Sequence, residues 1–418
     1  MTIAPPPPVR LSPTPIALVT YSTKPRGGVA HTLAVGEALH ALGQEVLIVA
    51  LGDPAAGFHR PVAAPVRIVP APPAPVLPAS AGPAAVMEAK VTANIDALAA
   101  ALADVAPAYP ILHTQDCIAA RAAARVRDSG VPCTVLRTVH HVDDFASAML
   151  MDCQRRAIVE PDHVLVVSEL WRRILQDEYG VSAEIVPNGV DAARYRDPDP
   201  DLVARLRARV GAADRPLLLA VGGIEPRKGS DTLMAALSLL RAGRTPPPVL
   251  AVVGGHSFQD HRAYRESVLA GFDALGLTLG TDVVEIGTVP DEEMPAWYGA
   301  ADALAFPSTK EGFGLAALEA MAAGLPVVVA DLPVFREWLT PGRDALAAPV
   351  GDPAALAAAL AAVLDDPGLR ARLRDAGRRL ADRLTWTAAA RRHLEVYAGL
   401  GVRAARPGHA AHGGHIAG

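Results

Sequence analysis

The stretch Pro307-Ser-Thr-Lys-Glu-Gly-Phe-Gly314-Leu-Ala-Ala-Leu-Glu-Ala-Met-Ala-Ala-Gly-Leu-Pro-Val327 decides the fold expected for the second half of the chain. Apolar runs at Ala303–Phe306 and Val327–Ala330 have the length of buried strands. Between them, a glycine-containing loop precedes an apolar segment of helical character, Leu315–Ala323. A strand, a helix and a second strand in this order indicate a parallel α/β sheet.

The same alternation extends along the chain in both directions. In the second half, further strands are expected at Leu217–Val221, Val249–Val253 and 283–286, and further helices at 231–240 and 354–364. In the first half, strands are expected at 16–21, 45–51, 111–113, 134–140, 163–167 and 184–186, with a helix at 29–42. The pattern predicts two Rossmann-like, doubly wound α/β domains facing each other across a ligand-binding cleft.

The expected domain boundaries follow from proline-rich and glycine-rich segments. The predicted parts are a Pro-rich tail at 1–15, domains at 16–195 and 196–384, a closing segment at 385–402 and a disordered tail at 403–418. The run Asp197-Pro-Asp199-Pro-Asp201 is expected to be the linker region, with Asp199 as helix N-cap and Pro200 as first helical residue. Its D-x-D motif also occurs in metal-dependent transferases of another fold, but the prolines favour a linker. The tail histidines His409, His412 and His415 are likewise not expected to form a metal site.

Composition and net charge narrow the classes of function that the chain can have. With 418 residues, 51% of them hydrophobic and 20% charged, the chain is long enough for two globular domains. A net charge of −5 gives no support for nucleic acid or an anionic membrane as the main partner. The three cysteines form no C-x-x-C pair, which favours reduced thiols in the cytoplasm. No signal peptide is expected, and the uncharged stretch 68–87 contains six prolines, so any membrane contact would be peripheral.

The loop before the predicted helix at Leu315–Ala323 is the strongest candidate site. The free N–H groups and the positive dipole end of a helix that begins near Gly314 suit a pyrophosphate. Glu311 in the loop and Glu319 in the helix can accept hydrogen bonds from hydroxyl groups. The structural alternative is a solvated Glu311 and an exposed Glu319.

A second candidate follows the predicted strand Leu217–Val221. Arg227 and Lys228 lie in a turn at its end, where cations can neutralise a leaving nucleotide diphosphate without a metal. The alternative is a basic surface turn.

Two weaker candidates lie in the first half. Gly27 and Gly28 follow the first strand and let backbone amides approach a ligand, although an ordinary tight turn explains them equally well. This loop is not G-x-G-x-x-G, so a nicotinamide site loses its support. His140 ends another predicted strand and can hydrogen-bond a ligand, or it can simply be packed beside a solvated His141.

Together and in this order, these motifs resemble glycosyltransferase family 4 over almost the whole chain. The segments Pro187-Asn-Gly-Val-Asp191 and Gly287-Thr-Val-Pro-Asp-Glu-Glu, the residues Trp297-Tyr298 and the stretch from Glu311 to Gly324-Leu-Pro-Val are similar to that family. The last segment, with Trp386 and Tyr397, looks like the family's closing helices, which cross back to the first domain.

The resemblance implies a GT-B fold and a retaining, metal-independent glycosyltransferase of the hexosyltransferase type that needs no cofactor beyond a UDP- or GDP-sugar. Catalytic roles would fall to Lys228 at the diphosphate and to Glu311 and His140 at the donor sugar, with Glu319 at the ribose. The other donor-binding residues would be Gly27, Gly28, Arg227, Gly312, Phe313, Gly314 and Leu315. The leaving phosphate would help to take the acceptor proton, so that no residue need be a nucleophile.

Two departures from the family leave questions open. The family usually has an arginine where this chain has Gly223, so a diphosphate contact is missing or comes from Arg227. The residue after the strand-end histidine is often aspartate and here is His141, although the spacing from Thr138 favours His140 as the sugar contact. The alternatives are a GT-B nucleotide-sugar epimerase or hydrolase and a catalytically silent nucleotide-sugar-binding protein. The acceptor (a glycan, lipid or small molecule) and the oligomeric state stay open.

Overall fold

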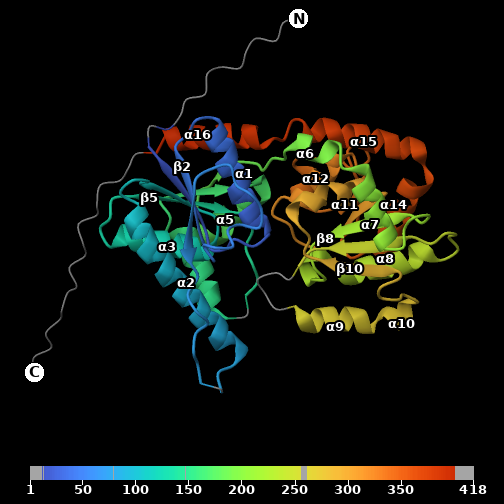
Figure 1. Ribbon diagram of the computed structural model, residues 1–418, viewed down its shortest axis with the longest axis horizontal. Helices are drawn as coiled ribbons and strands as arrows, with labels where there is room; N and C mark the ends of the chain where they lie inside the picture. The colour runs from blue at the N-terminus through green and yellow to red at the C-terminus, as the bar shows by residue number, and fades with distance from the viewer. Residues whose placement is uncertain (1–11, 13, 79, 146, 256–260, 401–418) are drawn as a thin grey trace, which may run out of the picture. The chain divides into compact units, whose positions relative to one another are not determined.

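The computed structural model describes residues 12, 14–78, 80–145, 147–255 and 261–400, and these divide into two units (Figure 1). The first unit contains the residues up to Val166, Trp171–Val186 and the residues from Ala390. The second contains Val167–Leu170 and Pro187–Ala389. The predicted tail at 403–418, its three histidines and nearly all of the predicted tail at 1–15 lie outside the described residues.

The first unit is built on a seven-stranded sheet in which all neighbouring strands are parallel. In sheet order its strands are β3 (Val66–Pro70), β2 (Val46–Gly52), β1 (Ile16–Thr20), β4 (Ile111–Thr114), β5 (Thr134–Val139), β6 (His163–Val166) and β7 (Glu184–Ile185). The helices with residues in this unit are α1 (Gly27–Ala41), α2 (Pro83–Val105), α3 (Cys117–Asp128), α4 (Ala148–Val159), α5 (Glu169–Tyr179) and α16 (Trp386–Ala398). The strand order reverses direction between β1 and β4, which is where doubly wound sheets bind ligands.

The second unit repeats this plan with a six-stranded parallel sheet. Its order is β10 (Val283–Gly287), β9 (Val249–Val253), β8 (Leu217–Val221), β11 (Ala303–Phe306), β12 (Val327–Ala330) and β13 (Leu346–Ala348). Its α-helices are α6 (Ala192–Arg196), α7 (Pro200–Arg209), α8 (Ser230–Arg241), α9 (Arg262–Ala270), α10 (Phe272–Leu275), α11 (Met294–Ala300), α12 (Leu315–Ala323), α13 (Pro333–Arg336), α14 (Pro353–Asp365) and α15 (Pro367–Ala381), and its 3₁₀ turns are η1 (Pro226–Lys228) and η2 (Asp291–Glu293). The strand order reverses between β8 and β11.

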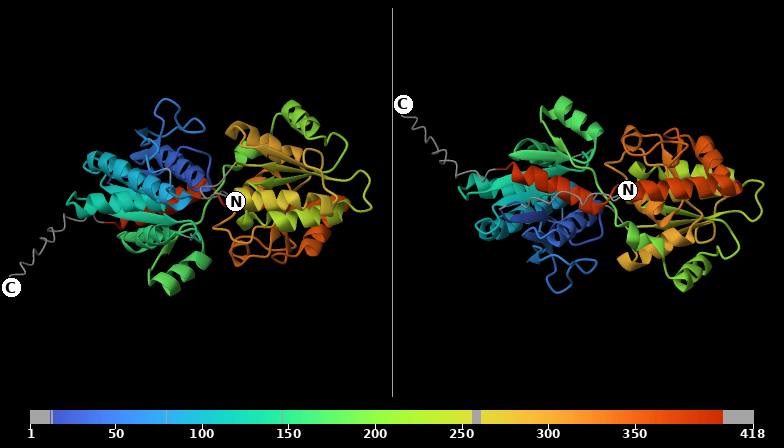
Figure 2. Two further views of the ribbon diagram at one scale, coloured as in Figure 1. Left: turned by 90° about the horizontal axis from the view of Figure 1, so that it is seen from below. Right: turned by 90° about the horizontal axis from the view of Figure 1, so that it is seen from above.

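Apolar side chains on both faces of the strands explain why helices cover both faces of each sheet (Figure 2). Every residue of β1, β9, β11 and β12 is buried, as in parallel sheets generally. On one face of the second sheet, Leu233 and Leu237 of α8 and Leu360 of α14 join Leu218 and Leu250 in a single apolar core. The prediction of two doubly wound parallel-sheet α/β domains is therefore confirmed.

The division between the units lies at Val186, before the expected boundary at 195 and the expected linker at 197–201. The segment that follows packs within the second unit. A Cβ added to Gly189 would lie 2.2 Å from the carbonyl carbon of Thr385, and Tyr195 packs edge-on against Tyr298. Asp199 caps α7 by accepting from the Asp201 amide, and Pro200 is the first residue of that helix.

The structure adds two features to the picture from sequence. β3 lies within residues 61–83, a region rich in proline, and α2 begins at the last of these residues, Pro83. β3 is an edge strand, where Pro70 costs no ladder hydrogen bond. In the part of the chain that the structure describes, no helix has both the length and the apolar character for a membrane span. The same residues contain no group of three or more His, Cys, Asp or Glu side chains suited to a metal ion.

Candidate functional site

Two loops of the second unit come together at the reversal point of its sheet. β8 and β11 are paired in parallel, so the turn after β8 and the loop after β11 emerge at the same edge. The Thr309 amide donates to the Arg227 carbonyl over 2.8 Å. Gly229, with φ of +62°, packs so closely that an added Cβ would lie 2.2 Å from the Pro307 carbonyl oxygen. The sequence around Lys228 and the sequence around Glu311 therefore form one site.

Three charged side chains form the centre of this site, which we call the Lys228–Arg227–Glu311 cluster. Lys228 Nζ lies 2.8 Å and Arg227 Nη1 3.1 Å from the same atom, Glu311 Oε1. Burial alone would raise the pKa of Glu311, but Lys228 and Arg227 outweigh it and lower the pKa to about 2. Burial lowers the pKa of Lys228, and Glu311 acts in the opposite direction. The buried carboxylate is thus ionised at neutral pH and held by two cations.

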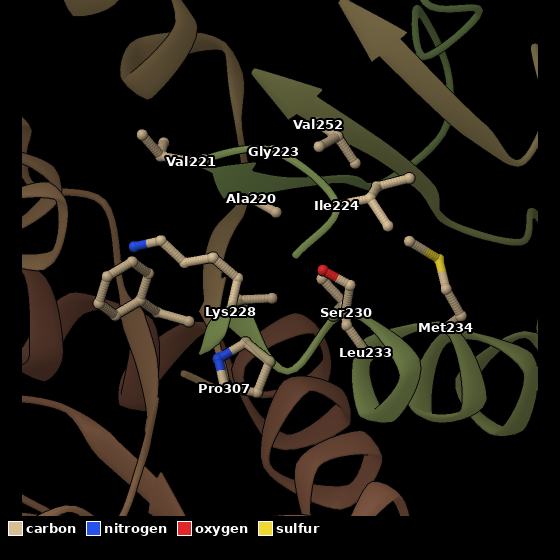
Figure 3. Close-up of a pocket in the computed structure, with 13 residues that line it drawn as sticks. Ala220, Val221, Gly223, Ile224, Lys228, Ser230, Leu233, Met234, Val252 and Pro307 are labelled. Atoms are coloured by element: carbon tan, nitrogen blue, oxygen red, sulfur yellow. The ribbon is translucent and has the colours of Figure 1, made fainter. Parts of the chain in front are cut away.

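The Lys228 side chain lies against apolar surroundings. Its ammonium is 4.6 Å from the centre of the Phe306 ring, and its stem passes Gly222, where an added Cβ would lie 2.8 Å from Lys228 Cε. Behind it is a cavity of about 20 Å³, with Lys228 and Met234 on opposite sides (Figure 3). A cavity of this size has room for about one water molecule and none for a nucleotide. A nucleotide would therefore bind outside this cavity.

Aromatic packing fixes the loop that leads into α12. Gly314, the N-cap residue, has φ of +94°, and an added Cβ would lie 2.5 Å from the Phe335 ring. Phe313 is stacked on Trp338 with centroids 5.1 Å apart, and Trp338 Nε1 donates to the Phe313 carbonyl over 3.1 Å. Gly312 is buried and Leu315 partly exposed. The first turn of α12 is thereby fixed beside Glu311, and the start of a helix leaves N–H groups that can bind an anion.

Glu319 is only partly exposed, and tyrosines contact it. The Tyr298 hydroxyl donates to Glu319 Oε2 over 2.7 Å, and the Tyr195 hydroxyl also hydrogen-bonds this carboxylate. Burial raises the pKa of Glu319, while the Tyr298 hydrogen bond acts to lower it. The sequence indicated Glu319, and Tyr298 as part of the family resemblance, but not that Tyr298 of α11 and Tyr195 of α6 contact Glu319.

The structure explains why position 223 lacks a side chain. A Cβ added to Gly223 would lie 2.8 Å from the Gly255 carbonyl oxygen, because the loops after β8 and β9 are in close contact. Arg227, four residues later in the sequence, carries its guanidinium into the cluster and also donates to the Lys310 carbonyl over 3.3 Å. An arginine is therefore present at the site, although not at position 223.

In the first unit, His140 lies beside the Gly27–Gly28 loop. A Cβ added to Gly28 would lie 3.9 Å from His140 Cδ2. His140 Nε2 is 3.2 Å from Gln115 Oε1, and its ring meets His31 edge-on at 4.6 Å. His141 instead lies 3.3 Å from Asp143. The strand-end histidine that neighbours the glycine loop is thus His140.

A group of buried histidines that the sequence did not indicate lies next to His140. His113 on β4 is fully buried between the Tyr397 hydroxyl at Nδ1 and the Thr138 hydroxyl at Nε2, each 2.7 Å away. The His393 ring of α16 is 5.5 Å from the His113 ring. Burial lowers the pKa of His113 and of His140 well below 6.5, and neighbouring histidines add to this effect. Both imidazoles are therefore neutral hydrogen-bonding groups at pH 7.

These lowered pKa values predict that the protein loses stability in acid. The unfolded chain takes up protons near pH 6.5, while folded His113 and His140 resist protonation. Their contribution to the free energy of unfolding is complete above that pH and decreases as the pH falls through it. Asp116, whose pKa burial raises to about 6, acts in the opposite direction.

The measurement is urea unfolding at a series of pH values for the wild type, His113→Gln and His163→Gln. We expect His113→Gln to reduce the loss of stability below pH 6.5. The exposed His163 serves as control and should leave the dependence unchanged. Equal pH dependence in wild type and His113→Gln would contradict the assignment.

Comparison with known proteins matches each part of the chain to a glycosyltransferase family model. The family model described as Glycosyltransferase Family 4 matches residues 25–194. The model described as Glycosyl transferases group 1 matches residues 204–380. The two matches do not overlap, and together they include the residues of both loops described above.

Two curated relatives are similar over part of their length. A GDP-mannose-dependent alpha-(1-6)-phosphatidylinositol monomannoside mannosyltransferase of Mycolicibacterium smegmatis is 34% identical over 255 residues, covering 59% of this chain and 64% of that protein. A D-inositol 3-phosphate glycosyltransferase of Thermobispora bispora is 38% identical over 218 residues, covering 51% of this chain and 49% of that protein. The chain thus spans between 49% and 64% of the length of these relatives.

Solved structures match over nearly the whole chain. Sucrose-phosphate synthase from Thermosynechococcus elongatus has a TM-score of 0.74 at 25% identity, covering 92% of this chain and 98% of that one. The Anabaena protein Alr3699/HepE in complex with UDP and glucose has a TM-score of 0.74 at 20% identity, covering 93% of this chain and 100% of that one.

Proposed function

Because the chain belongs to the group 1 glycosyl transferases, with a family 4 first part and a GT-B fold, we propose that it transfers a sugar from a UDP- or GDP-sugar to an acceptor hydroxyl. The observation that carries this proposal is the Lys228–Arg227–Glu311 cluster beside the start of α12. It combines two cations, a carboxylate and a helix N-terminus at the reversal point of a doubly wound sheet.

Each part of the cluster has a role in this reaction. Lys228, Arg227 and the first N–H groups of α12 stabilise the negative charge that develops on the leaving nucleoside diphosphate. Glu311 accepts hydrogen bonds from sugar hydroxyls once the phosphates share its cations. Glu319 binds the ribose. These groups are already partly desolvated, which strengthens their electrostatic effect.

The stereochemistry and the metal requirement belong to the same proposal. The acceptor attacks from the face that the diphosphate leaves, so the anomeric configuration is retained and the leaving phosphate takes the acceptor proton. His140, a neutral imidazole, hydrogen-bonds the donor sugar, and the backbone at Gly27 and Gly28 contributes amides to the diphosphate. No metal ion takes part. A cytoplasmic location is part of the proposal and agrees with three free thiols.

The names of the relatives suggest which substrates to try first. The name of the Mycolicibacterium relative contains GDP-mannose, and both names contain an inositol compound. The first donor panel is therefore GDP-mannose, other GDP-sugars and UDP-sugars, with inositol phosphates as acceptors.

The test is nucleotide release from each donor in the presence of EDTA, with and without acceptor. Release from one donor, with a product of unchanged anomeric configuration, supports the proposal. Loss of activity in EDTA that Mn²⁺ restores would contradict metal independence. An epimerised nucleotide sugar, or hydrolysis that no acceptor accelerates, would favour an epimerase or hydrolase. Binding without turnover against the whole panel would favour a silent binding protein.

We expect Arg227→Ala to weaken binding of the nucleoside diphosphate by about tenfold, as for the loss of one charge-assisted hydrogen bond. Isothermal titration calorimetry measures this directly. Arg244→Ala is the matched control, since Arg244 also pairs with a carboxylate, that of Asp365, and belongs to the same unit. Equal affinity in wild type and Arg227→Ala would show that Arg227 does not replace the arginine missing at position 223.

A further inference from the structure

Glu319 belongs to a cluster of three side chains from three helices, here called the Tyr195–Tyr298–Glu319 cluster. Tyr298 of α11 donates to Glu319 Oε2 over 2.7 Å, and Tyr195 of α6 reaches the same carboxylate on α12. The two tyrosine rings meet edge-on with centroids 5.7 Å apart. Two donors from different helices fix the orientation of the carboxylate more closely than the helix alone could.

Both tyrosine hydroxyls can donate a hydrogen bond to Glu319. Tyr298 is 1% and Tyr195 5% exposed, and burial, followed by the nearby Glu319, raises the pKa of each well above 10. The hydroxyls therefore stay protonated and direct hydrogen atoms at Glu319. A carboxylate has about four lone-pair sites, so two tyrosine hydroxyls leave acceptor capacity for a ligand.

A separate ion pair holds Tyr195 in place. Arg194 donates to the Asp291 carbonyl over 2.5 Å and lies 2.7 Å from Asp291 Oδ2. The Arg194 guanidinium also lies 5.3 Å from the centre of the Tyr195 ring. The segment just after the unit boundary is thus held in place, with the Tyr195 hydroxyl at Glu319.

We propose that Tyr298 and Tyr195 are positioning residues that orient Glu319 toward the vicinal hydroxyls of a ribose, and so make the site selective for ribonucleoside over 2′-deoxyribonucleoside diphosphates. This inference rests on the proposed function, in which Glu319 binds the ribose of the donor. Without the tyrosine hydroxyls the Glu319 carboxylate can rotate. It then no longer has the fixed orientation that favours a hydrogen bond from the ribose 2′-hydroxyl. A site that hydrogen-bonds a hydroxyl group discriminates strongly against the analogue without it.

The experiment compares affinities for UDP and 2′-deoxy-UDP, and for GDP and 2′-deoxy-GDP, by calorimetry. We expect the wild type to prefer the ribonucleotide of the base it binds by about tenfold or more. Tyr298→Phe should reduce this preference to about threefold or less, chiefly by weakening binding of the ribonucleotide. Tyr195→Phe should reduce it by a smaller factor. Tyr264→Phe, a change on α9, is the matched control and should keep the full preference.

A double-mutant cycle separates positioning from a general structural effect. In a Glu319→Ala background the preference should already be lost, so Tyr298→Phe should change it no further. Equal weakening of ribo- and deoxyribonucleotide binding by Tyr298→Phe would overturn the inference, as would a wild type that binds both equally. In either case nucleotide is still bound and the proposed function stands. Absence of any nucleotide binding by the wild type would instead overturn both. If Tyr298→Phe does not fold, Tyr195→Phe alone decides the question.

Discussion

Lys228→Met should lower kcat for transfer from the nucleotide-sugar by about 100- to 1000-fold, the range seen when one preorganised donor is removed from a developing negative charge. The lysine ammonium is among the best-placed cations of the site, 2.8 Å from Glu311 and partly removed from water. Methionine preserves the length and apolar character of the stem that passes Gly222. The substitution should therefore remove the positive charge of the side chain and leave its shape nearly unchanged. Steady-state kinetics with the donor identified by the release assay measures it.

The same substitution should also destabilise the protein, which provides an internal control. Removing one partner of a buried ion pair typically costs about 3 kcal/mol, although Arg227 remains beside Glu311 and should reduce that loss. In Lys228→Met with Glu311→Gln, no carboxylate charge is left without its lysine, so the free energy of unfolding should recover. Activity should not recover. A double variant that regains both would show that Lys228 serves stability alone.

Gly229→Ala should cost about 2–5 kcal/mol in the free energy of unfolding, because the left-handed backbone of an alanine costs about 1–2 kcal/mol and the steric overlap about 1–3 kcal/mol. Gly229 has φ of +62° and ψ of +37°, and its added Cβ would meet the Pro307 carbonyl oxygen at 2.2 Å. Because this contact joins the two loops of the site, nucleotide affinity should fall with stability. Chemical unfolding and calorimetry on the same samples test both effects.

Gly276 provides a closely matched control. Its φ of +62° and ψ of +34° are almost those of Gly229, yet an added Cβ would meet nothing within 4 Å in the described part of the chain. Gly276→Ala should therefore cost only the conformational term, about 1–2 kcal/mol. Equal losses in the two variants would mean that the contact with Pro307 contributes nothing.

Five of the six strands of the second unit were predictable from sequence because they are short apolar runs, whereas β13 and several helices, among them α9, α11 and α15, were not predicted. β8, β9, β11, β12 and α12 have the predicted bounds. β3 was not predicted, because it is exposed along part of its length and ends at Pro70. α2 was not predicted either, because a proline-rich stretch precedes it and the helix itself begins at a proline, Pro83. Edge elements carry a weaker apolar pattern than central ones.

The candidate site was predictable as a set of residues but not as a set of contacts. The sequence indicated Lys228, Arg227 and Glu311 separately, while their pairing depends on which strands are neighbours in the sheet. Lys228 and Glu311 are 83 positions apart, and only the adjacency of β8 and β11 unites them. The partners of Glu319 were inaccessible for the same reason, because Tyr195 and Tyr298 reach it from helices whose packing no local pattern encodes.

The division of the chain sets an unusual order of assembly during protein synthesis. The second unit is complete in sequence at Ala389, but the first needs the residues from Ala390 onward. Its buried His113 hydrogen-bonds to Tyr397, 284 positions later, so this contact cannot form until nearly the last of the described residues has been made. Domains are generally expected to fold in the order in which the ribosome makes them. Here the unit whose strands are translated first gains its last residues after the second unit is complete in sequence.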